Sequence, residues 1–356
     1  MTAGKSGSEP DFESKPRKQI APKSGSDPDF RAVAAWLFVC AAFTFAIVVV
    51  GGITRLTESG LSIVEWQPIV GALPPLSQAD WEALFAKYRE TPQYQKVFSE
   101  IGLEGFKRIF WWEYLHRLLA RVIGLVFLLP FLWFLFRRKL SKPLAWKLAG
   151  LFVLGGLQGA MGWYMVKSGL VDNPRVSHLR LTAHLGLALL IFAAEFWLAL
   201  ELLNPSKTKQ QHPLSRVVLG LVFLMALSGG FVAGLRAGHA YNTFPLMNGH
   251  LVPPEAFMLD PWWSNFFWNV ATVQLVHRAI FWLLLILIPL LWWQARRTTA
   301  KVAAHHLLAM FVLQASLGIS TLLLAVPIPL AAAHQAGAVL LLACALWTAQ
   351  ALRRPA

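Results

Sequence analysis

Long apolar stretches alternate with short polar or basic segments along most of this chain. An α-helix needs roughly 20 mainly apolar residues to cross the hydrocarbon core of a bilayer, and eight stretches meet that requirement. They cover residues 32–52, 115–136, 146–166, 179–203, 215–235, 271–293, 303–325 and 329–350. The pattern therefore predicts an all-α, polytopic membrane protein with eight transmembrane helices.

The composition agrees with this prediction. Of the 356 residues, 56% are hydrophobic and only 14% are charged, which excludes an ordinary soluble domain. The net charge of +14 does not indicate nucleic-acid binding, because the basic residues lie beside the apolar stretches, where they orient a protein in the membrane. Cys40 and Cys344 lie inside apolar stretches, so neither a disulfide framework nor a CxxC motif is available.

Basic residues gather in the short segments that join the second helix to the third, the fourth to the fifth and the sixth to the seventh. They are Arg137, Arg138, Lys139, Lys142, Lys147, Lys207, Lys209, Arg216, Arg296, Arg297 and Lys301, and Arg353 and Arg354 follow the last helix. Because positively charged loops stay in the cytoplasm, we expect both termini there, with residues 1–31 forming a disordered basic tail. The expected location is the cell inner membrane, with the longer loops on the periplasmic side.

The longest outer loop is expected at residues 53–114. Its segment WEALFAKYRETPQYQKVF spaces Trp81, Leu84, Phe85 and Tyr88 as on one face of a helix. Two placements fit this spacing. The helix could lie on the outer membrane surface, or it could be an ordinary helix packed within the loop.

The two halves of the chain resemble each other. Gly51-Gly52 at the end of the first helix corresponds to Gly229-Gly230 in the fifth. Three further pairs are EYLHR (113–117) with QLVHR (274–278), LGGLQGAMG with VLQASLG in the third and seventh helices, and RLTAHLG (180–186) with AAAHQAG (331–337). A duplicated unit explains these pairs economically. We therefore predict two pseudo-symmetric four-helix bundles, at 32–203 and 204–356.

Each half carries two histidines inside predicted membrane helices, His116 and His184 first, then His277 and His334. With a rise of about 1.5 Å per residue, all four lie within roughly 10 Å of the outer helix ends and share one depth. Imidazole suits iron, and a four-helix bundle can hold a porphyrin between axial ligands. A single membrane histidine is often only an interhelical hydrogen-bonding group. Four in a repeated pattern favour two bis-histidine haem sites, whereas a closed zinc site needs four ligands.

A carboxylate distinguishes the first histidine pair from the second. Glu113 lies one helical turn before His116, so both side chains share a face, and it could orient the ligand or accept a proton. The equivalent residue in the second half is Gln274. This asymmetry indicates that the first site reacts and that the second carries electrons. The alternative is an interfacial carboxylate that Arg117 neutralises.

Arginines follow the histidines in both halves. Arg117 and Arg278 are the next residues after His116 and His277, and Arg121 lies one turn beyond Arg117. Guanidinium groups pair well with the carboxylates of haem propionates. Arg117 and Arg278 could instead extend to the outer membrane surface, and Arg121 could form a structural ion pair.

Several motifs in order along the chain resemble the haem A synthase family, in its proteobacterial and mitochondrial branch. They are GGITRLTESGLSIVEWQPIVGALPP, EYLHR, RLTAHLG, GLRAGHAYNTFPLMNG, QLVHR and AAHQAG. The resemblance extends from about residue 32 to 350. It implies oxidation of the C8 methyl group of haem O to the formyl group of haem A, for use by a cytochrome oxidase. Some bacterial relatives carry paired cysteines in outer loops, and this chain has none there.

The resemblance also implies a role for each site residue. His277 and His334 would ligate a resident haem B, with Arg278 beside them. His116 and His184 would hold the substrate haem, supported by Arg117 and Arg121, with Glu113 as the essential acidic partner. Expected partners are membrane lipid, haem O synthase and cytochrome oxidase assembly factors, and a homo-oligomer is compatible with the sequence.

Three other functions use some of the same features. A dihaem electron-transfer cytochrome needs the same histidine pairs, although such proteins usually stack their haems at two depths across the bilayer. A transporter built from repeats would share the symmetry but does not need four histidines. A haem-delivery chaperone would bind haem without changing it, and Glu113 is the residue that separates it from an enzyme.

Overall fold

The computed structural model describes residues 28–66, 70–171, 174–204 and 212–353. Most of the expected N-terminal tail, residues 1–27, lies outside the described residues, as do Lys207, Lys209 and Arg354. Helices dominate the described part of the chain, which contains one isolated β-bridge, between Met247 and His250, and no named strand.

Eight of the helices are long and apolar enough to cross a membrane, so the predicted multi-pass membrane protein is confirmed. They are α1 (Pro28–Leu56), α4 (Leu103–Phe136), α5 (Lys142–Lys167), α6 (His178–Leu203), α7 (Pro213–Gly234), α9 (Val270–Ala295), α10 (Lys301–Leu323) and α11 (Ile328–Ala351). Most ends fall within a few residues of the sequence-based expectation, because a long apolar run fixes a membrane helix more tightly than a soluble one.

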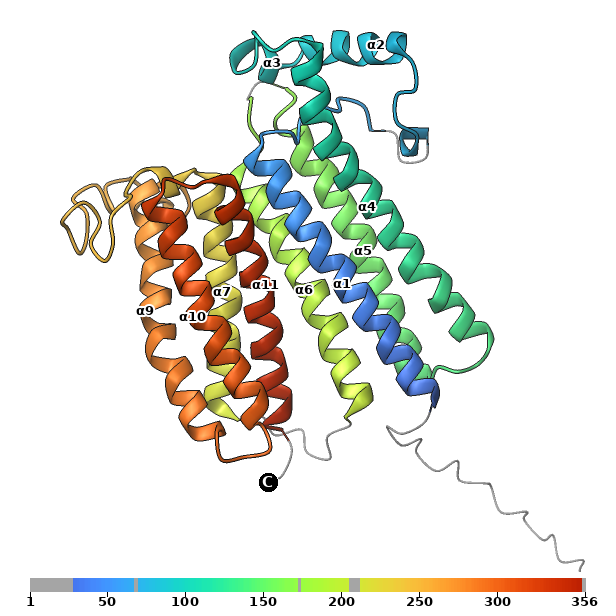
Figure 1. Cartoon of the computed structure of the whole chain (residues 1–356), viewed down its shortest axis with the longest axis vertical. Helices are drawn as coiled ribbons and strands as arrows, with labels where there is room; N and C mark the ends of the chain where they lie inside the picture. Colours follow the sequence, from blue (N-terminus) through green and yellow to red (C-terminus); the bar gives the residue numbers. More distant parts are fainter. Residues whose placement is uncertain (1–27, 67–69, 172–173, 205–211, 354–356) are drawn as a thin grey trace, which may run out of the picture.

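The remaining elements are short and belong to the connections. They are η1 (Val70–Ala72), α2 (Gln78–Arg89), α3 (Pro92–Lys96), η2 (Ala237–His239), η3 (Trp262–Ser264) and α8 (Asn265–Trp268). Figure 1 shows α2, α3 and the loop between α7 and α9 at one end of the molecule, whereas α11 ends at the other. Below, the first is called the loop end.

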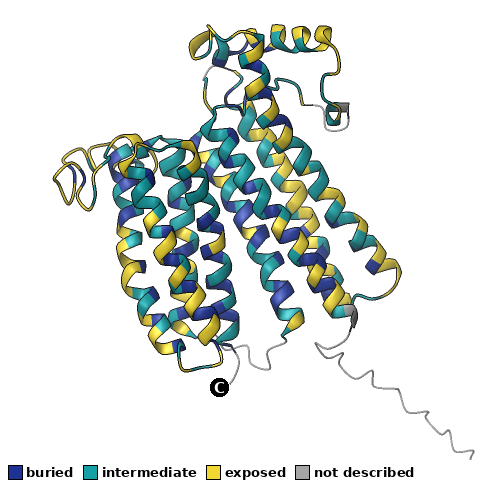
Figure 2. Ribbon diagram, viewed as in Figure 1, coloured by how far each residue is buried: buried dark blue, intermediate teal, exposed yellow. Residues whose placement is uncertain are grey.

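The long helices pack as two rings. In the first ring α1 contacts α4 and α6, and α5 also contacts both; in the second, α7 contacts α9 and α11, and α10 also contacts both. The rings meet where α6 packs on α7 and where α11 packs on α1 and α6 (Figure 1). Exposed positions follow the outer faces of α4, α9 and α10 (Figure 2), as expected for helices that face lipid. The division of the chain into two functional domains stays a prediction.

Residues at equivalent positions of the repeat meet between the rings. Arg55 and Ala233 stand four residues after Gly51 and Gly229, and the Arg55 guanidinium donates to the Ala233 carbonyl. Glu58 and Arg236 are likewise equivalent, and they form an ion pair. Contacts between matching positions are those that a pseudo-two-fold axis would produce, so these two pairs lie close to the axis relating the repeats.

The long outer loop is shorter than expected, because α4 begins at Leu103 rather than near residue 115. The additional N-terminal turns of α4 carry Phe106 and Phe110. These rings pack against Trp81, Phe85 and Tyr88 of α2. Ser77 caps α2 by accepting a hydrogen bond from the backbone N–H of Asp80. The apolar face of α2 therefore packs on α4, and the position of α2 relative to the membrane surface stays a prediction.

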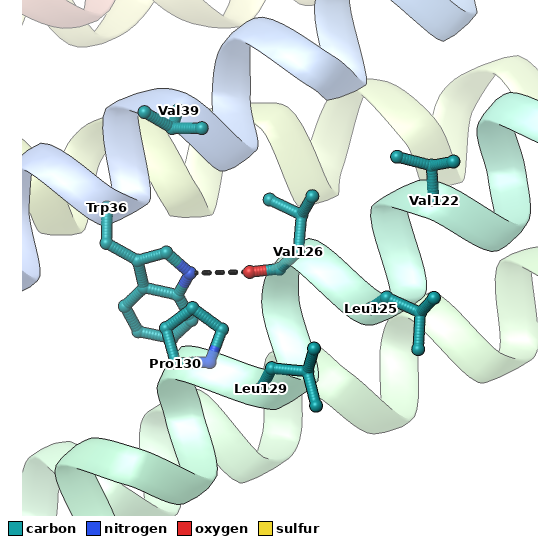
Figure 3. A pocket seen from close by; sticks show the side chains of 7 residues that line it. All are labelled: Trp36, Val39, Val122, Leu125, Val126, Leu129 and Pro130. Carbon is teal, nitrogen blue, oxygen red and sulfur yellow. Dashed lines mark hydrogen bonds between the residues drawn. The ribbon is translucent and has the colours of Figure 1, made fainter.

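Pro130 lies inside α4 and, lacking an N–H, cannot donate to the carbonyl of Val126 one turn earlier. The indole Nε1 of Trp36 on α1 donates to that carbonyl instead, at 2.9 Å (Figure 3). This bond satisfies a carbonyl that lipid could not. The same residues line an open apolar groove of about 460 Å³ between α1 and α4, together with Val39, Val122, Leu125 and Leu129.

Replacing Phe106 with alanine tests how α2 is held. Phe106 is fully buried against Tyr88, with ring centroids 5.2 Å apart, and loss of a buried Phe side chain costs about 3–5 kcal/mol. We expect the segment from α2 to α3 to become sensitive to trypsin while the membrane helices stay folded. The matched control is Leu76→Ala, whose side chain is 83% exposed; equal trypsin sensitivity of both variants would contradict the packing role.

Candidate functional site

The four predicted histidines lie in two pairs, one in each ring. His116 (α4) lies within electrostatic range of His184 (α6), and His277 (α9) within range of His334 (α11). In each ring the two histidine-bearing helices are not direct neighbours, since the other two helices stand between them. The imidazoles therefore face each other across the interior of a ring.

All four imidazoles share one depth near the loop end. His184, His277 and His334 each follow the start of their helix by two turns, roughly 10 Å at 1.5 Å per residue. His116 is placed at the same level by its contact with Gly51, close to the end of α1. Neither pair lies deeper than the other, so the two pairs stand side by side in the plane of the membrane.

A glycine on the neighbouring helix lies against every one of these rings. The closeness is measured by the distance from a Cβ added to the glycine to the Cε1 atom of the histidine. This distance is 2.9 Å for Gly51 with His116, 3.1 Å for Gly162 with His184, 3.5 Å for Gly229 with His277 and 2.7 Å for Gly318 with His334. Real Cβ atoms are almost never closer than 3.0 Å to such a neighbour. At Gly51 and Gly318 a side chain would therefore have to displace the imidazole, at Gly162 the ring would have to shift slightly, and at Gly229 a Cβ would make ordinary contact.

The surroundings of the rings fit axial binding of an iron. The Nδ1 atoms of His116, His184 and His334 are buried without a hydrogen-bond partner among the described residues, and the Nδ1 of His277 is 2.8 Å from the Ser228 hydroxyl. With Nδ1 buried, or paired with Ser228 in the case of His277, Nε2 is the nitrogen that remains on each ring to ligate a metal.

The backbone that carries the second histidine of each pair is fixed in the same way in both rings. Gln158 donates to the carbonyl of His184 at 3.0 Å, and Gln314 donates to the carbonyl of His334 at 2.9 Å. No cluster of three or more His, Cys, Asp or Glu side chains that could hold a metal ion occurs among the described residues. An iron that a porphyrin already binds needs only axial ligands from the protein. Each histidine pair can supply these ligands, so the arrangement suits two such irons.

Glu113 is buried, with 3% of its surface exposed, and its carboxylate is held on both sides. One oxygen accepts hydrogen bonds from the Ser62 hydroxyl and the Ile63 backbone N–H, both at 2.8 Å. The other pairs with the Arg117 guanidinium at 2.6 Å. The ion pair that the sequence suggested as an alternative is therefore present, although a role for Glu113 in proton transfer stays a prediction.

Arg117 also fixes the loop that follows α1. Its guanidinium donates to the carbonyls of Ile63 and Glu65, at 2.8 and 2.9 Å, and it stacks over the ring of Trp66. Glu113 and Arg117 together thus tie residues 62–66 over the first histidine pair. Arg121, one turn farther along α4, is half-buried; contact of either arginine with a propionate stays a prediction.

The second ring holds its loop in the same way, but an amide, Gln274, replaces the carboxylate. Gln274 donates to the carbonyl of Ala237 at 3.0 Å, and Arg278 donates to the carbonyls of Tyr241, Pro245 and Leu246 at 3.0 to 3.2 Å. Both side chains are buried. Glu113 and Gln274 therefore differ in charge, as the sequence predicted. Both are buried, and both hold equivalent loops.

The sequence interpretation missed several residues that position the site. The contacts of Gly162 and Gly318 with the histidines follow from the same repeat that aligns the Gln and His residues, so a full alignment of the halves would have found them. Ser62 had no such signal, because its bond to Glu113 joins residues 51 positions apart. Glu195 was also overlooked: it is 2% exposed inside α6 and accepts a hydrogen bond from Thr44 of α1 at 2.9 Å.

Comparison with known proteins agrees with this arrangement. The family model of the cytochrome oxidase assembly proteins COX15-CtaA matches residues 34–346. A protein named heme A synthase from Nitrosospira multiformis is 61% identical over 335 residues, which cover 91% of this chain and 94% of the relative. Those from Nitrosomonas eutropha and Rhodospirillum centenum are 55% and 51% identical, covering 90% and 91% of this chain and 93% and 89% of the relatives. Since the match takes in nearly all of the membrane helices, this chain belongs to the COX15-CtaA family.

Proposed function

We propose that this protein is a membrane oxidoreductase that converts haem O to haem A by oxidising the C8 methyl group to a formyl group. The observation that carries the proposal is the pair of repeated histidine sites at one depth, of which only the first stands beside a buried carboxylate, Glu113. The name heme A synthase, shared by the relatives, supports the same reaction. The product would serve the assembly of a cytochrome oxidase.

The second ring is the proposed site of a resident haem B, with His277 and His334 as axial ligands. Because Nδ1 of His277 is bonded to the Ser228 hydroxyl, Nε2 is the nitrogen by which this residue would hold the haem. Haem B held by two imidazoles supplies one-electron transfer and has no open position for dioxygen. Arg278 holds the loop above this site and is the proposed partner of a propionate there.

The first ring is the proposed site of the substrate. His116 and His184 hold haem O from its two sides, and Arg117 and Arg121 are the proposed partners of its propionates. With water as the source of the oxygen atom, the step balances as –CH3 + H2O → –CHO + 4 H⁺ + 4 e⁻. The two pairs of electrons would leave through the second ring to an external electron acceptor, and Glu113 would accept the protons in turn and pass them on. Its bonds to Ser62 and Arg117 fix the carboxylate one turn from the ligand His116.

The orientation in the membrane is part of the proposal. The basic segments that join the long helices, including Arg137, Arg138, Arg296 and Arg297, lie at the end opposite the loop end. The positive-inside rule then puts that end in the cytoplasm and both haem sites near the periplasmic face of the inner membrane. Haem O synthase is the proposed source of the substrate.

A dihaem electron-transfer cytochrome is the main alternative. Four histidines at a single depth cannot carry an electron across the bilayer, which disfavours it. The test is to extract and chromatograph the haem of the purified protein, expressed with and without a haem O synthase. We expect haem B alone without the synthase, and haem B with haem O or haem A in its presence. Two molecules of haem B per chain in both preparations would instead identify a cytochrome.

Replacing Glu113 with glutamine separates an enzyme from a haem-delivery chaperone. We expect haem content to be kept and haem A formation to fall by roughly 100-fold or more, the lower range for loss of a general acid or base. Glu104→Gln, an exposed carboxylate on the same helix, is the control and should leave product levels unchanged. Normal haem A formation by Glu113→Gln would remove this carboxylate from the mechanism.

Alanine substitutions of the histidines test which site is which. His277→Ala and His334→Ala should lose haem B, because a buried axial ligand is missing, and with it all activity. His116→Ala and His184→Ala should keep one haem B per chain, show its bis-histidine absorption spectrum and fail to retain haem O. Loss of haem B from the second pair of variants would reverse the assignment.

A further inference from the structure

An aromatic pair closes the second ring between α9 and α10. Phe281 and Phe311 stack with ring centroids 6.1 Å apart and an interplanar angle of 22°. Phe311 is only 4% exposed and belongs to the large hydrophobic core that joins the rings. Phe281 stands four residues after His277, one turn deeper in the membrane. The pair therefore fills the space between the two helices just beneath the histidines of that ring.

In the first ring, the equivalent positions carry an alanine and a glycine, the two smallest residue types. Ala120 stands four residues after His116, and Gly155 stands three residues before Gln158, as Phe311 stands three before Gln314. Ala120 and Gly155 are both exposed, and a Cβ added to Gly155 would have open space around it. Gly124 and Gly159, the next small residues on these helices, have equally open surroundings. The aromatic stack that joins α4 and α5, Phe127 with Phe152 at 6.2 Å, lies deeper, seven residues after Ala120 and three before Gly155. At the level of Ala120 and Gly155 themselves, no stacked aromatic pair joins these two helices among the described residues.

This opening leads to the first histidine pair. Ala120 lies one turn below His116, about 6 Å along the axis, and Gly155 is on the same face of α5 as Gly162, which lies against His184. The Nδ1 atoms of both histidines are buried and lack a partner among the described residues. A flat apolar molecule that passes between α4 and α5 would reach the open edges of both rings.

We propose that the gap between α4 and α5, bordered by Ala120, Gly124, Gly155 and Gly159, is a lateral portal. Through it haem O enters from the bilayer and haem A leaves, with the isoprenoid tail resting in the gap. This proposal rests on the proposed function. A substrate must exchange, whereas a resident haem B must stay, and the portal is open in the ring assigned to the substrate and closed in the other.

The physical chemistry of the tail favours such a portal. Lipid chains are as apolar as an isoprenoid, so the tail gains little by leaving the bilayer for the protein interior. An opening toward lipid lets the porphyrin enter the ring while the tail stays in an apolar environment. Polar backbone groups are not exposed by the gap, because both of its walls are continuous α-helices.

The test transfers the aromatic pair to the first ring. The double variant Ala120→Phe/Gly155→Phe is purified as the full chain with haem B bound, and its uptake of added haem O in lipid nanodiscs is followed by absorption and by haem chromatography. We expect uptake to slow roughly tenfold or more, with one haem B per chain retained. The matched control is Leu125→Phe/Leu157→Phe, on the same two helices at residues that are 55% and 53% exposed, which should take up haem O like the parent.

The reverse variant opens the second ring. Phe281→Ala/Phe311→Gly should release haem B into empty nanodiscs at least about tenfold faster than the parent, a result that does not depend on haem A formation. Uptake of haem O by Ala120→Phe/Gly155→Phe at the parent rate would overturn the portal. A parent that takes up haem O through an open gap but never forms haem A would refute the proposed function and leave the portal standing.

Discussion

The close approach of each membrane imidazole to a glycine on the next helix is the contact on which the site depends. The Cε1 atoms of the four histidines lie where a Cβ on Gly51, Gly162, Gly229 or Gly318 would touch or crowd them. At Gly51 and Gly318, where that Cβ would come closer than 3.0 Å, a larger residue would push the helices apart or turn the ring away. With Nδ1 buried or paired with Ser228, Nε2 is the nitrogen left on each ring to bind a metal. Helix packing in the membrane thus fixes where the four imidazoles lie, which is what their proposed role as haem ligands requires.

The helices that carry His116 and His277, α4 and α9, also hold the loops at the loop end. Glu113 and Arg117 bind residues 62–65, and Gln274 and Arg278 bind residues 237–246, from the turns next to His116 and His277. A buried group with charge or hydrogen-bonding capacity is costly unless it is satisfied, and here the backbone of each loop satisfies it. The position of each loop is therefore coupled to the position of a histidine.

The two rings share one architecture because the chain is an internal repeat. The proposed division of labour rests on the positions at which the two halves differ. Equivalent residues meet near the axis between the rings, as Arg55 and Ala233 do. The two rings then differ at a few positions: a buried carboxylate against a buried amide at 113 and 274, and the exposed Ala120 and Gly155 against the stacked Phe281 and Phe311 beneath the histidines. Each difference suits a ring that exchanges and oxidises its ligand beside one that keeps it.

The sequence by itself determined the eight membrane helices, the repeat and the four histidines, because long apolar runs, matched motifs and a fixed helical rise are local properties of the chain. It could not locate the start of α4, since residues 103–114 mix charges with aromatic side chains and become helical through packing on α2. Nor could it show that Ser62 holds Glu113 or that Gly155 and Gly159 have open space around them. Those features depend on contacts between residues far apart along the chain, and only the tertiary structure brings such residues together.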